Sequence, residues 1–152
     1  MAIKNYTTSI NEEKTISEIE KILGSNGVKS VFKQYNGDGK VKSIAFTVMI
    51  NDREIPFLLP MKEDKILNIL KKSKKGTSRI KATEEQARMT GWRIIKDWID
   101  AQMALIQIDL VKLEQVFLPY MYDMNNDITL FEKLEKKNFN LILEDKSNKE
   151  QI

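Results

Sequence analysis

The longest run of regular hydrophobic spacing lies between Thr83 and Ile108 and contains both tryptophans of the chain. Small or apolar residues recur there at alternating steps of four and three, which is the spacing of one helix face. These positions are Ala87, Gly91, Ile94, Trp98, Ala101 and Leu105. Gln86 follows Thr83 at the spacing of a capping box. The pattern therefore predicts a long helix that begins after Thr83 and packs through this face.

Two shorter helices are predicted from the same kind of spacing. Ser9 and Glu12 have the spacing of a capping box, and isoleucine and leucine then recur at helical intervals. This predicts a helix over residues 10–23, which the following glycines end. Apolar residues at helical intervals predict another helix over residues 61–72.

Alternation of apolar and polar residues predicts three strands between these helices. Residues 28–35 and 40–50 alternate on either side of the turn sequence NGDG, which is typical of a hairpin. A third strand follows at residues 53–60, where Pro56 removes a ladder donor and indicates an edge strand or a bulge. The three strands should form an antiparallel meander.

This order of elements predicts an α+β fold: an N-terminal helix, a three-stranded antiparallel meander, a short helix, and a long helix packed on the sheet. We expect one domain over residues 1–140, with a basic mobile loop at about 71–82 and a partly disordered tail over 141–152. The stripe on the long helix would also allow pairing with a second copy, which is a homodimer.

The composition removes several classes of chemistry. The chain contains no cysteine and no histidine, so it lacks the thiolate nucleophile, the usual general base and the commonest metal ligand. We therefore expect a protein without catalytic residues, metal or cofactor. No segment approaches the roughly 20 apolar residues that span a bilayer, and the N-terminus lacks the apolar run of an export signal. These features predict a cytoplasmic protein with no membrane partner.

The positive charge is concentrated in one part of the chain. The net charge is +3, and residues 62–81 alone contribute +6. The candidate nucleic-acid contacts are Lys71, Lys72, Lys74, Lys75, Arg79 and Lys81. Clustered cations neutralise phosphates and bind nucleic acid in a salt-dependent way. The block has no aromatic residue, so a solvated connector is the alternative, and Phe32 or Tyr35 would have to supply base stacking.

The order α-β-β-β-α over residues 10–72 is also that of a double-stranded RNA-binding domain. Such domains have a lysine cluster at the start of their last helix. Here the lysines follow the short helix, so the resemblance is one of topology and transfers no functional residue.

A protein partner would need a different surface. The candidate contacts are Arg88, Trp92, Lys96, Tyr120 and Tyr122, because aromatic residues and arginine are enriched at interfaces. Trp98 lies in the apolar stripe and is expected in the core, whereas Trp92 projects to one side of it.

Other polar groups have simpler interpretations. Arg93 and Asp97 have the spacing of an ion pair on one helix. Asp123, Asn125 and Asp127 have the spacing that opens a calcium loop. That loop also needs a glycine and a glutamate at the positions of Ile128 and Leu134, so no metal site is predicted.

Four segments together resemble a family of small, mostly uncharacterised proteins of phages, prophages and other mobile elements. They are MAIKNYTTSI, the LLP after the strands, GWRIIKDWIDAQMALIQ and VFLPYM, within residues 1–121. The resemblance implies a non-enzymatic accessory protein that binds a host or phage protein or nucleoprotein, such as an inhibitor of a CRISPR defence. The alternative is an accessory protein that binds nucleic acid directly in phage replication or recombination.

Overall fold

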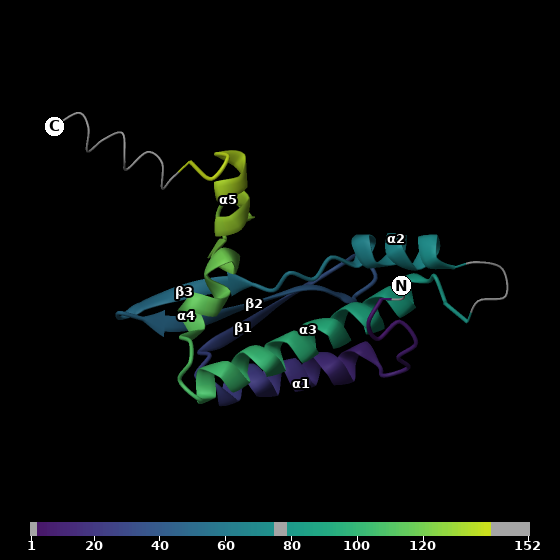
Figure 1. Cartoon of the computed structure of the whole chain (residues 1–152), viewed down its shortest axis with the longest axis horizontal. Helices are drawn as coiled ribbons and strands as arrows, with labels where there is room; N and C mark the ends of the chain where they lie inside the picture. The colour runs from purple at the N-terminus through teal and green to yellow at the C-terminus, as the bar shows by residue number, and fades with distance from the viewer. Residues whose placement is uncertain (1–2, 75–78, 141–152) are drawn as a thin grey trace.

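The helices and strands follow one another in the predicted order, and a small hairpin and helix are added near the C-terminus (Figure 1). The computed structural model describes residues 3–74 and 79–140. The first six elements are α1 (Glu12–Ser25), β1 (Ser30–Tyr35), β2 (Val41–Ile50), β3 (Arg53–Leu58), α2 (Glu63–Ser73) and α3 (Glu84–Gln107). They are followed by α4 (Leu113–Phe117), the 3-10 turn η1 (Leu118–Tyr120), β4 (Tyr122–Asp123), β5 (Ile128–Thr129) and α5 (Leu130–Lys136). The predicted α+β class is confirmed, and the predicted tail over 141–152 lies outside the described residues.

The start of α1 differs from the prediction. The backbone N–H of Glu13 donates to Oδ1 of Asn11 at 2.8 Å, so Asn11 caps the helix instead of Ser9. Asparagine is as strong an N-cap as serine, and the capping-box spacing alone did not distinguish them. The helix consequently begins at Glu12 rather than Ile10 and continues past Gly24 to Ser25.

The three long strands form one antiparallel sheet in the order β1-β2-β3. Pro56 on β3 pairs with Thr47 on β2, so it lies on an edge strand as predicted. Ile44 and Phe46 on β2 belong to the buried core, while Met49 on the same strand is 47% exposed. The register between β1 and β2 shifts between Gln34 and Tyr35, which is a β-bulge at the hairpin end of β1.

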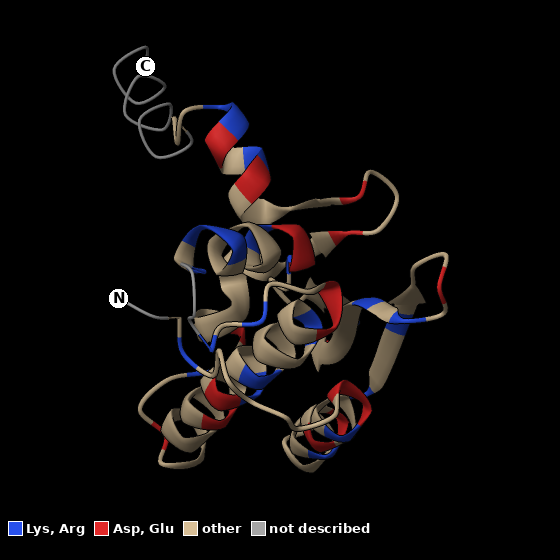
Figure 2. Cartoon of the chain, turned by 90° about the vertical axis from the view of Figure 1, so that its right-hand side faces the viewer, with Lys and Arg blue, Asp and Glu red and all other residues tan. Residues whose placement is uncertain are grey.

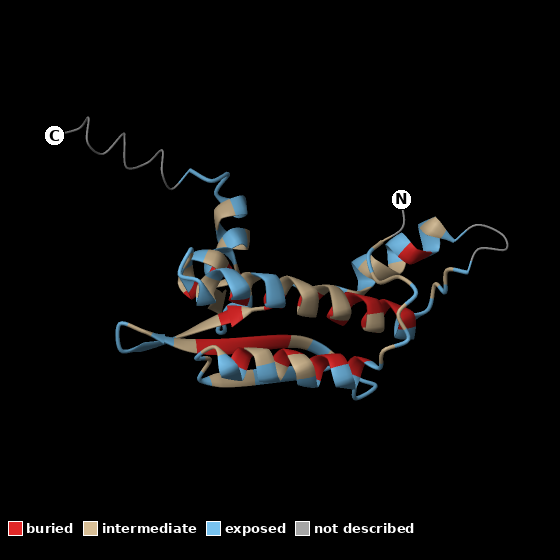
Figure 3. Cartoon of the chain, turned by 60° about the horizontal axis from the view of Figure 1, so that its bottom comes forward, coloured by how far each residue is buried: buried red, intermediate tan, exposed pale blue. Residues whose placement is uncertain are grey.

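Helices α1 and α3 lie side by side and run in the same direction over one face of the sheet (Figure 3). Glu12 at the start of α1 contacts Arg88 near the start of α3, and Asn26 after α1 contacts Gln107 at the end of α3. Their buried faces share one hydrophobic core with β2, β3 and α4. The prediction that the long helix packs on the sheet is confirmed.

The face of α3 that enters the core was predicted wrongly. The buried row is Arg88, Trp92, Ile95, Ile99 and Met103, whereas Ala101 and Leu105 of the predicted stripe are exposed. A displacement by one residue turns a helix face by about 100°. Ala87 and Gly91 are nevertheless buried, and Gly91 faces the start of α2: an added Cβ there would clash with Cδ1 of Ile66 on α2 and would lie 2.6 Å from Sδ of Met61, which precedes that helix. Gly91 therefore marks the contact with α2.

Helix α2 takes in part of the lysine block. It runs to Ser73, one residue past the predicted end of that helix, so Lys71 and Lys72 lie in its last turn and the loop predicted at about 71–82 does not begin at residue 71. Cations are favourable there because they oppose the negative end of the helix dipole. Leu70 is its buried residue, and the side of α2 away from α3 faces solvent. Lys75 lies outside the described residues.

Candidate functional site

Helix α2 and the segment that leads into α3 carry a group of exposed cations at one end of the molecule (Figures 1 and 2). We call this group the basic surface. Its residues are Lys62, Lys65, Lys71, Lys72, Lys74, Arg79 and Lys81. None of them forms an ion pair with any residue of the described chain. Their charges are therefore available to an external anion.

Some cations elsewhere in the fold hold neighbouring elements together. Lys33 on β1 pairs with Glu20 of α1 at 2.8 Å, and Arg93 on α3 pairs with Glu18 of α1 at 2.8 Å. These pairs join neighbouring elements, and the bond to Glu20 raises the pKa of Lys33. The basic surface lacks such partners because α2 touches the rest of the fold along one side. The basic surface is distinguished by the number of such unpaired cations that lie close together on α2 and before α3.

Sequence reasoning named five described residues of this surface and missed two. Lys62 and Lys65 lie at the start of α2, and Lys65 is on the same helix face as Lys72, seven residues later. The helical spacing from Lys65 to Lys72 was visible in the sequence, and it would have extended the candidate site along α2.

Two of the predicted partner contacts lie inside the protein. Trp92 is 0% exposed and belongs to the core, and its Nε1 has no hydrogen-bond partner among the described residues. Arg88 is 9% exposed and holds two carboxylates. The expectation that these two side chains face a partner is therefore wrong. Trp98, expected in the core, is half-buried at its margin against Phe117 and Tyr120.

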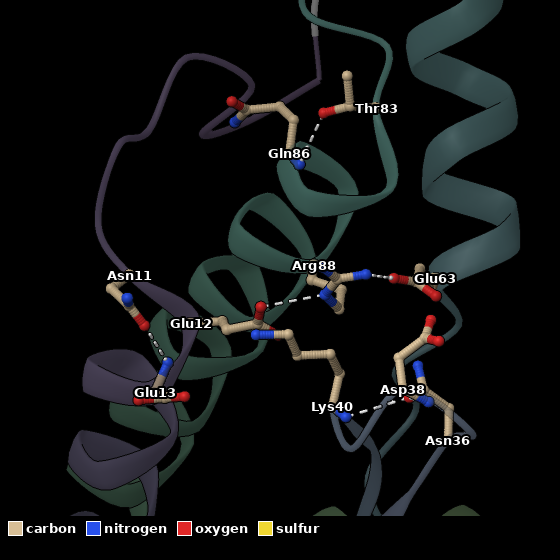
Figure 4. A network of polar contacts seen from close by, with 10 residues as sticks. All are labelled: Asn11, Glu12, Glu13, Asn36, Asp38, Lys40, Glu63, Thr83, Gln86 and Arg88. Carbon is tan, nitrogen blue, oxygen red and sulfur yellow. Dashed lines mark hydrogen bonds and ion pairs between the residues drawn. The ribbon is translucent and has the colours of Figure 1, made fainter.

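Arg88 joins three helices through two ion pairs (Figure 4). Its Nε donates to Oε1 of Glu12 on α1 at 3.0 Å, and its Nη1 donates to Oε1 of Glu63 on α2 at 2.9 Å. Burial acts to lower the pKa of Arg88, but these two hydrogen bonds outweigh it and raise the pKa. The sequence could not predict this network, because both partners are distant along the chain.

The second carboxylate oxygen of Glu12 is buried and has no hydrogen-bond partner among the described residues. It borders a hollow of about 270 Å³ that Lys40 and Glu85 also line. The side chain of Lys40 extends from the β1–β2 hairpin toward this carboxylate (Figure 4). The β1–β2 hairpin therefore brings the charge of Lys40 close to Glu12 and Arg88 at the start of α1.

The remaining predicted partner contacts are spread over separate places. Lys96 pairs with Asp100 one turn later on α3 at 2.8 Å. Tyr120 packs its ring 5.4 Å from that of Trp98. The hydroxyl of Tyr122 donates to Asp127, and this bond raises the pKa of Tyr122 to about 12. A partner-binding role for these residues stays a prediction.

Arg93 and Asp97 do not form the predicted pair with each other. Arg93 binds Glu18, while Asp97 accepts from Nδ2 of Asn5 at 3.1 Å and lies 3.3 Å from Nζ of Lys4. Burial acts to raise the pKa of Asp97, but the bonds from Asn5 and Lys4 outweigh it and lower the pKa. The two residues instead attach α1 and the N-terminal segment to α3.

The acidic residues before α5 stabilise a turn. Asp123 accepts from the backbone N–H groups of Asn125 and Asn126 and from Nζ of Lys133. Bonds from Asn126 and Lys133 hold its pKa well below the usual range. Within residues 3–74 and 79–140, no group of three or more acidic side chains is placed to hold a metal ion. No helix in the same ranges is long and apolar enough to cross a membrane.

Comparison of the chain with models of known families, with curated proteins and with solved structures finds no match. The site is therefore interpreted from its geometry and charge.

Proposed function

We propose that this protein is a non-enzymatic binding protein whose basic surface contacts the phosphate backbone of a nucleic acid. The observation that carries the proposal is the set of exposed cations on α2 and before α3 that have no ion-pair partner in the described chain. Free cations release counterions from phosphates when they bind, which favours association with a polyanion.

Direct contact with nucleic acid ranks ahead of the protein-partner hypothesis for a structural reason. Trp92 is buried and Arg88 is engaged by Glu12 and Glu63, so neither side chain is offered to another protein. The resemblance to phage accessory proteins supplies the proposed setting, which is nucleic acid or nucleoprotein in the host cytoplasm. Inhibition of a host defence complex through its nucleic acid falls within this proposal.

The test is a titration of labelled DNA and RNA, followed by fluorescence anisotropy at several salt concentrations. The site variant replaces Lys71, Lys72 and Lys74 with glutamine. Each lost phosphate contact should reduce the slope of log affinity against log salt by about 0.9 for duplex DNA or about 0.7 for a single strand. We therefore expect weaker binding and a shallower slope for this variant.

The matched control changes the same amount of charge elsewhere. Lys14, Lys21 and Lys112 are exposed and unpaired among the described residues, so their triple glutamine variant has the same net charge as the site variant. It should bind almost as well as the natural protein. Equal losses in the two variants, or no binding by the natural protein at low salt, would contradict the proposal.

A further inference from the structure

A groove of about 850 Å³ lies beside the basic surface. Its walls come from the β1–β2 hairpin, the start of α2 and the C-terminal β4–β5 hairpin with α5. The volume is within the range of ligand sites in proteins, roughly 300–1,000 Å³. Lys62 and Lys65 line the groove and also belong to the basic surface. A ligand chain could therefore pass from one to the other without a break.

The groove has three lysines that can contact the phosphates of an anionic ligand. Lys42, Lys62 and Lys65 line it, and none of the three forms an ion pair with the described chain. Of the four lining carboxylates, Glu63 is neutralised by Arg88, whereas Asp127 and Glu132 accept hydrogen bonds from the uncharged hydroxyls of Tyr122 and Thr129, which do not neutralise them. Asp64 is the remaining lining carboxylate. The three lysines are matched in number by three carboxylates without an ion-pair partner in the described chain, so the net positive charge that attracts a polyanion comes from the adjacent basic surface, and phosphates would contact the groove at its lysines.

Tyr35 adds an aromatic surface to these cations. It lines the groove and is 58% exposed, although tyrosine is a large and partly apolar side chain. The β-bulge between Gln34 and Tyr35 interrupts the regular register of β1 at this point. Bulges commonly re-aim a side chain near a functional site. An exposed ring next to free cations is the combination that binds a base together with its phosphate.

We propose that this groove binds unpaired nucleotides, with a base stacked on Tyr35 and phosphates on Lys42, Lys62 and Lys65. The inference rests on the proposed function and specifies its ligand as single-stranded nucleic acid. Bases within a duplex are stacked on one another, so their faces are not accessible to Tyr35. A strand that leaves the groove continues along α2, where Lys71 and Lys72 meet its next phosphates.

The experiment measures anisotropy of a labelled single strand and of the corresponding duplex with the natural protein, Tyr35→Ala and Tyr35→Phe. Loss of one stacked base should weaken single-strand binding by about 5- to 150-fold in Tyr35→Ala. Tyr35→Phe keeps the ring and should bind within about 2-fold of the natural protein, because stacking tolerates loss of the hydroxyl. Duplex affinity should change little in either variant.

Phe32→Ala is the matched control, because Phe32 is an exposed aromatic residue on the same strand and does not line the groove. It should leave single-strand affinity unchanged, and circular dichroism and melting temperature check that every variant folds. Equal effects of Tyr35→Ala on both nucleic acids, or preference of the natural protein for the duplex, would overturn the groove proposal and leave the basic surface standing. Absence of all nucleic-acid binding would overturn both.

A mononucleotide competitor distinguishes a strand from a free nucleotide. If one nucleotide supplies the full ligand, it should displace the labelled strand at a concentration near the dissociation constant of that strand, and the single-strand proposal fails. We expect displacement to need a much higher concentration, because the strand also contacts the cations of α2.

Discussion

At the scale of single residues, the two tryptophans of α3 have different environments. Trp92 is fully buried in the core between the helices and the sheet. Trp98 lies at the margin of that core, with edge-on contacts of 5.4 Å to the rings of Phe117 and Tyr120. An indole inside the core is protected from water and from small solutes, whereas a half-buried one is reached more easily.

This difference predicts a result for variants that keep one tryptophan. Trp98→Phe retains Trp92, whose fluorescence should be emitted at short wavelength and be only weakly quenched by acrylamide. Trp92→Phe retains Trp98, which should be quenched more strongly. In strong denaturant the two variants should become equally sensitive. Stronger quenching of Trp92 than of Trp98 in the folded proteins would show that the assigned burial is reversed.

At the scale of elements, Arg88 holds α1, α2 and α3 together by charge. Its side chain is 11% exposed, and that of Glu12 is 7% exposed. Charges that are buried in this way are costly to leave without a partner. Glu12 is especially sensitive, because its second oxygen already lacks a partner in the described chain.

Arg88→Met should therefore lower the free energy of unfolding by about 3–5 kcal/mol, measured by urea denaturation. Arg93→Met is the comparison. Arg93 bonds to Glu18, which is more exposed than Glu12, so this substitution should lower the free energy of unfolding by less. Adding Glu12→Gln to Arg88→Met should recover part of the loss, since it removes the unpaired charge. Equal losses of unfolding free energy in Arg88→Met and Arg93→Met would show that burial of the Arg88 ion pairs does not determine how much they stabilise the fold.

At the scale of the whole molecule, Phe117 links elements from both halves of the chain. Its ring contacts those of Phe46 on β2, Phe57 on β3 and Trp98 on α3. It is fully buried, so α4 closes the core that α1, α3 and the sheet share. A core with contributions from every long element is expected to unfold as one unit.

Unfolding followed by tryptophan fluorescence and by circular dichroism should therefore give the same transition. Phe117→Ala should lower the unfolding free energy by about 3–5 kcal/mol and shift both signals together. Phe131→Ala on α5, where the side chain is 45% exposed, should change stability by less than about 0.5 kcal/mol. Separate transitions for the two signals would show that the described chain contains more than one folding unit.

The candidate site was partly predictable from the sequence for a physical reason. The lysine block is local, so its charge was evident without a structure, and Tyr35 was one of two residues, with Phe32, that the sequence offered for base stacking. The groove was not predictable, because its walls come from the first hairpin, α2 and the last hairpin. Contacts between segments so distant in sequence exist only once the chain has folded.

The sequence by itself determined the order and type of the main elements, because helical and strand periodicity and the caps depend on near neighbours. Thr83 accepts from the backbone N–H of Gln86, and Pro56 lies on an edge strand, as their local patterns predict. Only the tertiary structure decided which face of α3 is buried. Arg88 enters that face because Glu12 and Glu63 neutralise it from other helices. Whether a charged side chain can be buried depends on partners that are distant in sequence. The helical spacing of apolar residues depends only on the residues of one helix.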